Sequence, residues 1–143
     1  MEIEKVEGRI RIHAMIMIGL LFVQYLLGMT TNLFVTFPDH GTDGQFWEFA
    51  WSQWPEASHI VVGSLLLIGA VVLNRRAFKL GSRRWIIASL TGSLSILVAG
   101  GFGALFIPSQ TDAYSFVMAV AFLVAISAYG FGLYRPEASS RNT

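Results

Sequence analysis

A carboxylate and an imidazole stand three residues apart in the segment Glu56-Ala57-Ser58-His59. Residues three apart lie on the same side of one helical turn, so a helix that begins here presents both groups together. Two uses of such a pair are physically sensible. The carboxylate can orient the imidazole and raise its basicity as a metal ligand. Alternatively, it can act as an acid or base beside a cofactor that the histidine holds, which makes Glu56 the candidate catalytic residue.

Three further residues are candidate contacts to such a cofactor. Gly63 follows His59 by about one helical turn and leaves space for the edge of a porphyrin. Gln24 is the most polar residue well inside an earlier apolar segment, where it either bonds to a neighbouring helix or contacts a ligand. Trp54 lies two residues before Glu56 and is included with them.

Other metal ligands are scarce in this chain. It has no cysteine, which excludes disulfides, thiolate chemistry and cysteine-ligated metals. His40 lies in a polar segment, where a solvated histidine is the simplest interpretation, and His13 closely follows two arginines. Because the first two apolar segments run antiparallel, we expect His13 and His59 at opposite membrane faces, unable to bind one metal ion or one haem iron together.

The elements that must position these residues are apolar helices. Apolar residues make up 54% of the 143 residues and charged residues 13%, against about 25% in soluble domains. This composition argues against a disordered chain, a nucleic-acid binder and an ordinary soluble enzyme. Four stretches of 18 to 27 residues lack Asp, Glu, Lys and Arg, and about 20 apolar residues cross a bilayer as a helix. The sequence therefore predicts an all-α, four-helix transmembrane bundle in one domain (1–143), with helices at about 10–33, 58–74, 85–107 and 111–134.

The charged residues divide between the connecting segments by sign. All ten Lys and Arg residues fall in the N-terminal segment, the loop 75–84 and the tail 135–143. In the other connections, every charged residue is acidic: Asp39, Asp43, Glu48, Glu56 and Asp112. Since basic residues favour the cytoplasmic side, the sequence predicts a multi-pass protein of the cell membrane with both termini in the cytoplasm.

The first outer loop, predicted at 34–57, is long and rich in aromatic residues. Asp43 is a candidate cap for a short helix. From there Trp47, Trp51 and Trp54 recur at i, i+4 and i+7, which places them on one helical face. We expect an interfacial helix with its indoles at headgroup depth. It serves either as a membrane anchor or as a lid over a pocket.

Small residues recur every four positions on the third predicted helix, at Ser95, Ala99 and Gly103. Such spacing lets helices approach closely in lipid. It also leaves room for a flat cofactor, so both interpretations stay open at this point.

With these features the chain resembles half of a heme A synthase, a family built from two similar four-helix halves. The resemblance covers the four-helix topology and is carried by Gln24 and Gly28 on the first helix, the long outer loop, and the segment Trp54-Pro55-Glu56-Ala57-Ser58-His59. It implies a haem near the outer side with His59 as a ligand to the iron. For the family's enzymes it also implies oxidation of a haem side group.

The chain departs from the family pattern in three ways. Ile60 stands where an arginine usually follows the family histidine, and the outer-loop cysteine pair of many members is absent. The fourth predicted helix has no histidine, the aligned position lying near Phe116. A haem with two histidine ligands therefore cannot be completed within one chain, so the iron is five-coordinate or takes a ligand from a second protomer or a partner.

Two hypotheses from different classes follow. In the first, the chain is a haem-binding membrane protein with Glu56 and His59 in its pocket. In the second, it is a non-enzymatic membrane subunit or assembly factor that packs against a second copy or a partner membrane protein. Glu56 and His59 then only begin the second helix at the bilayer surface.

Overall fold

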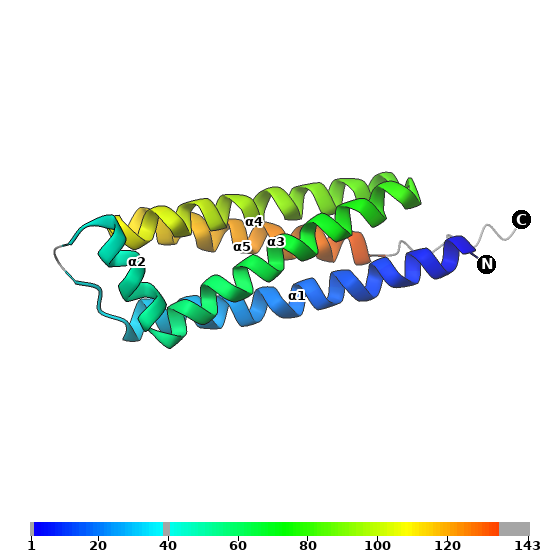
Figure 1. Cartoon of the computed structure of the whole chain (residues 1–143). Coiled ribbons are helices and arrows are strands. Elements are labelled where there is room, and N and C mark those ends of the chain that lie inside the picture. Colours follow the sequence, from blue (N-terminus) through cyan, green and yellow to red (C-terminus); the bar gives the residue numbers. More distant parts are fainter. Residues whose placement is uncertain (1, 39–40, 135–143) are drawn as a thin grey trace, which may run out of the picture.

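The computed structural model describes residues 2–38 and 41–134 as a bundle of helices (Figure 1). The five helices are α1 (Glu2–Phe34), α2 (Asp43–Ser52), α3 (Trp54–Leu80), α4 (Arg83–Ser109) and α5 (Asp112–Leu133). The four longer helices are long and apolar enough to cross a membrane. The predicted all-α bundle of four potential transmembrane helices is therefore confirmed.

The long helices form two antiparallel pairs. α1 packs along α3, and α4 packs along α5, while α3–α4 and α1–α5 contacts join the pairs. The short helix α2 contacts α3 and α4 at one end of the bundle (Figure 1). We call this the α2 end. The opposite end, where α1 begins, α3 turns into α4 and α5 finishes, is called the basic end.

Local sequence signals set the ends of α2 and α3. The backbone N–H of Thr42 donates to the Gln45 side chain at 2.9 Å, as in a capping box, so Thr42 and not Asp43 is the cap of α2. Asp43 is instead the first helical residue, where its charge complements the helix dipole. α3 ends at Gly81, which adopts the left-handed conformation (φ 68°) that closes many helices.

The helices α1 and α3 extend well beyond their predicted bounds. α3 covers Trp54–Leu80 instead of 58–74, so Arg75, Arg76 and Lys79 lie on a helix and not in a loop. α1 likewise begins at Glu2 and not near residue 10. The prediction ended the second helix at Asn74, directly before Arg75. Long basic side chains, however, extend from a helix into water while their stems cover apolar surface. Gly81 is the true stop signal between α3 and α4.

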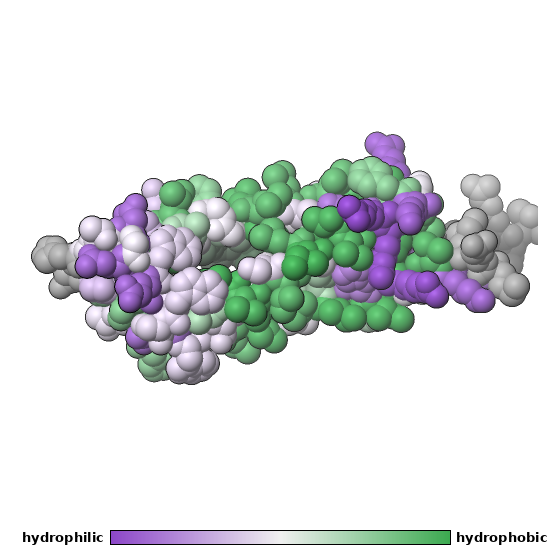
Figure 2. All heavy atoms as spheres, in the orientation of Figure 1, coloured by the Kyte–Doolittle hydropathy of each residue, from purple (hydrophilic) through white to green (hydrophobic). Residues whose placement is uncertain are grey.

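The outer surface is apolar along the middle of the bundle. Figure 2 shows a broad hydrophobic band between more hydrophilic ends, with strongly hydrophilic side chains gathered at the basic end. Large exposed side chains in this band include Leu26, Ile68, Leu94 and Leu123. A helix that is hydrophobic around its whole circumference suits a bilayer, which is the environment that this surface implies.

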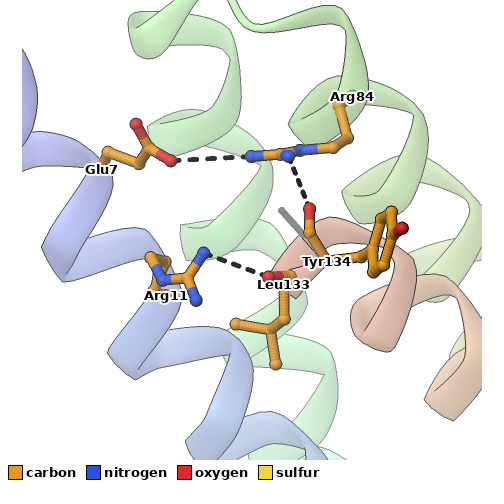
Figure 3. Close-up of polar contacts among 5 residues, drawn as sticks. All are labelled: Glu7, Arg11, Arg84, Leu133 and Tyr134. Carbon is orange, nitrogen blue, oxygen red and sulfur yellow. Dashed lines mark hydrogen bonds and ion pairs between the residues drawn. The ribbon is translucent and has the colours of Figure 1, made fainter. Parts of the chain in front are cut away.

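At the basic end, two arginines bind backbone carbonyls at the C-terminus of α5, those of its last residue and of the cap residue that follows (Figure 3). Arg11 Nη1 donates to the Leu133 carbonyl at 3.1 Å, and Arg84 Nη1 donates to the Tyr134 carbonyl at 2.6 Å. Arg84 also pairs with Glu7, at 3.5 Å between Nη2 and Oε1. Because these carbonyls have no partner within their own helix, the arginines cap α5 and tie it to α1 and α4.

The seam between α4 and α5 is closely packed because glycines receive aromatic rings. A Cβ atom added at Gly92 would lie 2.5 Å from the Tyr129 ring, and one added at Gly132 would lie 2.6 Å from the Trp85 ring. Both rings are fully buried. At these two positions of the α4–α5 seam, buried aromatic rings thus pack directly on the backbone.

Candidate functional site

A cavity of about 340 Å³ lies toward the α2 end, between the α1–α3 pair and the α4–α5 pair. All five helices contribute to its lining, α2 through Trp47. Its size falls at the lower end of the range for small-molecule and cofactor pockets. Four of the predicted candidates line it together: Gln24, Glu56, His59 and Gly63.

The two sides of the cavity differ in chemistry. α1 and α3 supply most of its polar side chains: Gln24, Thr31, Asn32, Glu56, His59 and Ser64. α4 and α5 supply mainly small or apolar residues, among them Ile96, Ala99, Gly100, Gly103, Ala104 and Ala119. We call these the polar wall and the small-residue wall. Such a cavity suits a ligand with an apolar body and a few polar groups.

The His59 imidazole is held in one orientation by the backbone of α1. Its Nδ1 lies 3.1 Å from the Gln24 carbonyl oxygen. A carbonyl can only accept, so Nδ1 carries the proton and Nε2 keeps its lone pair. Within the described part of the chain Nε2 has no hydrogen-bond partner. His59 can therefore offer Nε2 to a metal ion or to a hydrogen-bond donor.

Glycines on both helices allow this contact between α1 and α3. A Cβ atom at Gly28 would lie 3.0 Å from His59 Cε1, and one at Gly63 would lie 3.1 Å from Gln24 Nε2. The arrangement is reciprocal, because each helix carries a polar residue followed four positions later by the glycine that receives the other helix's polar side chain. The space beside Gly63 is thus taken by the Gln24 amide.

Glu56 is buried at the start of α3, with 6% of its surface exposed, and lines the cavity. The Thr31 hydroxyl lies beside its carboxyl group and interacts with it, although without the geometry of a well-formed hydrogen bond. No basic side chain pairs with Glu56 among the described side chains of residues 4–38 and 41–134. Nor does Glu56 hydrogen-bond to His59, so the group that orients the imidazole is the Gln24 carbonyl and not the expected carboxylate.

The tryptophans divide between two helices and two environments. Trp47 and Trp51 lie on α2, but Trp54 begins α3, because the helix breaks at Gln53. The predicted face of three indoles on one helix is therefore wrong. Trp47 lines the cavity, whereas Trp54 is 71% exposed and is not among the lining residues.

Thr31 is a lining residue that the sequence prediction missed. It lies three residues after Gly28 and seven after Gln24, so all three share one face of α1. Extending that helical periodicity from Gln24 and Gly28 would have found it. Trp47, by contrast, enters the cavity only because α2 folds across the bundle end, which no local spacing indicates.

The other histidines do not join His59 within the described structure. His13 lies toward the basic end, where its Nδ1 is 3.2 Å from Arg76 Nη1, and His40 lies outside the described residues. Phe116, at the position where the family pattern places a second histidine, is 69% exposed and not part of the lining. Over the described side chains, of residues 4–38 and 41–134, no group of three or more His, Asp or Glu could hold a metal ion.

Comparisons with known proteins found no matching family model, no matching curated protein and no matching solved structure.

Proposed function

We propose that this chain is a small membrane protein that binds haem in the cavity toward the α2 end, with His59 Nε2 as the ligand that would hold the iron. The observation that carries the proposal is the 3.1 Å contact between His59 Nδ1 and the Gln24 carbonyl. Ligand histidines usually donate their second ring N–H to a carbonyl or carboxylate, which fixes the tautomer and directs the other nitrogen at the metal. His59 already has this arrangement.

The rest of the lining suits a flat, largely apolar group. The small residues of the small-residue wall leave the backbones of α4 and α5 open to close approach. The lining includes no Lys or Arg, so the carboxylates of a haem would have to lie outside it. When bound, the iron would supply redox or ligand-binding chemistry.

His59 would supply one ligand to the iron, and the lining offers no second imidazole. Met29 and Met118 are its only thioethers. Methionine is a known haem ligand beside histidine, so either a thioether, a second protomer or a partner protein would complete the coordination.

We also propose that the α2 end faces outward and the basic end faces the cytoplasm of the cell membrane. Every described Lys and Arg lies at the basic end, in keeping with the positive-inside rule. The chain has no cysteine, so single substitutions are unique labels. Ser52→Cys should react with a membrane-impermeant maleimide on intact cells, and the matched Ser82→Cys should react only after lysis. The reverse pattern would overturn the orientation.

A second candidate, a subunit that packs against partner membrane proteins, is favoured by a separate groove. This groove, of about 240 Å³, runs between α4 and α5 and is lined by Leu94, Ser95, Val98, Val117, Val120, Ala121 and Val124. Small and β-branched side chains of this kind accept a neighbouring helix in lipid. Copurification of a stoichiometric partner that Val120→Trp displaces would support this function.

The absorption spectrum of the purified protein tests the haem proposal. After expression in a haem-replete host, the wild type should show a Soret band that His59→Ala loses. His13→Ala is the matched control, because it removes an imidazole at the basic end, and it should keep the band. A wild-type protein without a Soret band, or a band equally strong in His59→Ala, would refute the proposal.

A further inference from the structure

Within the described part of the chain, no basic side chain pairs with the carboxyl group of Glu56. Its side chain is buried to more than nine-tenths, it lines the cavity, and it belongs to a helix that can span the membrane. Its place in the first turn of α3 gives it the favourable end of the helix dipole. The partial positive charge of the helix terminus does not take the place of an ion-pair partner. Ionisable residues in membrane helices usually pair with another group or bind a ligand.

Some polar atoms of the residues that line this cavity with Glu56 can accept a hydrogen bond from a ligand. Gln24 Oε1 is buried without a partner, and His59 Nε2 has a free lone pair. The Thr31 hydroxyl, buried beside the Glu56 carboxyl, adds another oxygen. The polar wall therefore lacks positive charge, which a ligand could bring.

The protein itself cannot supply the cation within its described part. Every described Lys and Arg lies at the basic end, at the other end of the bundle from α2. The connections at the α2 end carry acids only, which favours the approach of a cation. The indole of Trp47 also lines the cavity, and aromatic faces attract ammonium groups.

We propose that Glu56, Thr31 and Trp47 form a subsite for the ammonium group of a lipophilic primary amine, whose hydrocarbon part lies along the small-residue wall. A primary ammonium has three N–H donors for the carboxylate and hydroxyl oxygens. This subsite goes beyond the haem proposal, because its binding group is the Glu56 carboxylate and not the His59 imidazole.

The test is a calorimetric titration of decylamine into protein that shows no Soret band, because a haem would occupy the same small-residue wall. The protein is held in phosphatidylcholine nanodiscs, with empty nanodiscs subtracted. Wild type should bind decylamine saturably, and Glu56→Gln should bind it at least about tenfold more weakly, the range expected when an ion pair is lost from a buried site. Glu48→Gln is the matched control, because it removes the same charge from an exposed position on α2. It should bind like wild type.

Two ligands of equal chain length separate the contributions of charge and hydrogen bonding. Decanol has a donor but no charge, and decyltrimethylammonium has a charge but no donor. Both should bind more weakly than decylamine. Equal binding of decanol and decylamine, or equal binding of decylamine to wild type and Glu56→Gln, would overturn the proposal.

If Glu56→Gln fails to fold, as judged by circular dichroism, Thr31→Val serves in its place. It removes one hydroxyl while keeping the side-chain shape, and should weaken decylamine binding several-fold. Unchanged binding in a folded Thr31→Val would then overturn the proposal. The titration requires no haem, so a missing Soret band and a missing response to decylamine are separate results.

Discussion

The α4–α5 seam and the α1–α3 seam are both built from side chains that pack on glycines, but the side chains differ in kind. In the α4–α5 seam, Tyr129 rests on Gly92 and Trp85 rests on Gly132, and both rings are fully buried. In the α1–α3 seam, His59 rests on Gly28 and Gln24 rests on Gly63, and these residues border a cavity. In each seam, each helix packs one side chain on a glycine of the other helix. The first places fully buried aromatic rings there, and the second places polar groups beside a cavity.

The difference indicates how stability and binding are divided in this molecule. Aromatic rings on bare backbone fill volume, and their loss leaves a void in a tight contact. An imidazole and an amide in the same position fill less volume but carry lone pairs and donors into an apolar region. We therefore expect α4–α5 substitutions to alter mainly the free energy of unfolding, and α1–α3 substitutions to alter mainly ligand affinity.

The largest effect on folding is expected in the α4–α5 seam. Tyr129→Ala should lower the free energy of unfolding by about 3–5 kcal/mol, as for other buried aromatic residues, because it leaves Gly92 facing a void. Unfolding in mixed micelles, followed by circular dichroism, measures this loss. Tyr129→Phe keeps the ring and removes a hydroxyl that makes no well-formed hydrogen bond, so it should cost less than about 1 kcal/mol. A Tyr129→Ala protein as stable as wild type would contradict the claim that the α4–α5 seam determines the free energy of unfolding.

The second-largest effect is expected from a substitution in the α1–α3 seam, and it is a loss of haem affinity. Gly28→Ala places a methyl group 3.0 Å from His59 Cε1 and should push the ring away from the Gln24 carbonyl. Haem affinity, measured by titration of the Soret band, should fall about tenfold, as when a group that orients a metal ligand is lost. Gly63→Ala is the matched control. Its methyl group meets only the flexible Gln24 amide, so a drop as large as that of Gly28→Ala would show that His59 is not the sensitive group.

How much of this the sequence could predict differs between the two seams. The helices themselves followed from charge-free stretches, and the proximity of Glu56 and His59 followed from their spacing of three. The seating of His59 on Gly28 could not be predicted, because it depends on how α1 is rotated against α3. Trp54 was misplaced because the periodicity continues through Gln53, where the chain leaves one helix and starts another. The haem and the orientation in the membrane stay predictions.

The smallest effect is expected at the basic end. Arg11→Gln removes the hydrogen bond to the Leu133 carbonyl and should lower the free energy of unfolding by about 1 kcal/mol, with haem affinity unchanged. The same micelle unfolding assay measures it, and Lys5→Gln, also basic but exposed on α1, is the matched control. A change in haem affinity upon Arg11→Gln would mean that the two ends of the bundle are coupled.

The most direct test of the central claim is chemical rescue of the imidazole. His59→Gly removes the side chain and leaves space for a free imidazole molecule beside the Gln24 carbonyl. We predict that haem titrated into His59→Gly gives no Soret shift, and that millimolar imidazole restores the shift seen in wild type. A full shift in His59→Gly without imidazole, or none in wild type, would contradict the claim that His59 holds a haem in this cavity.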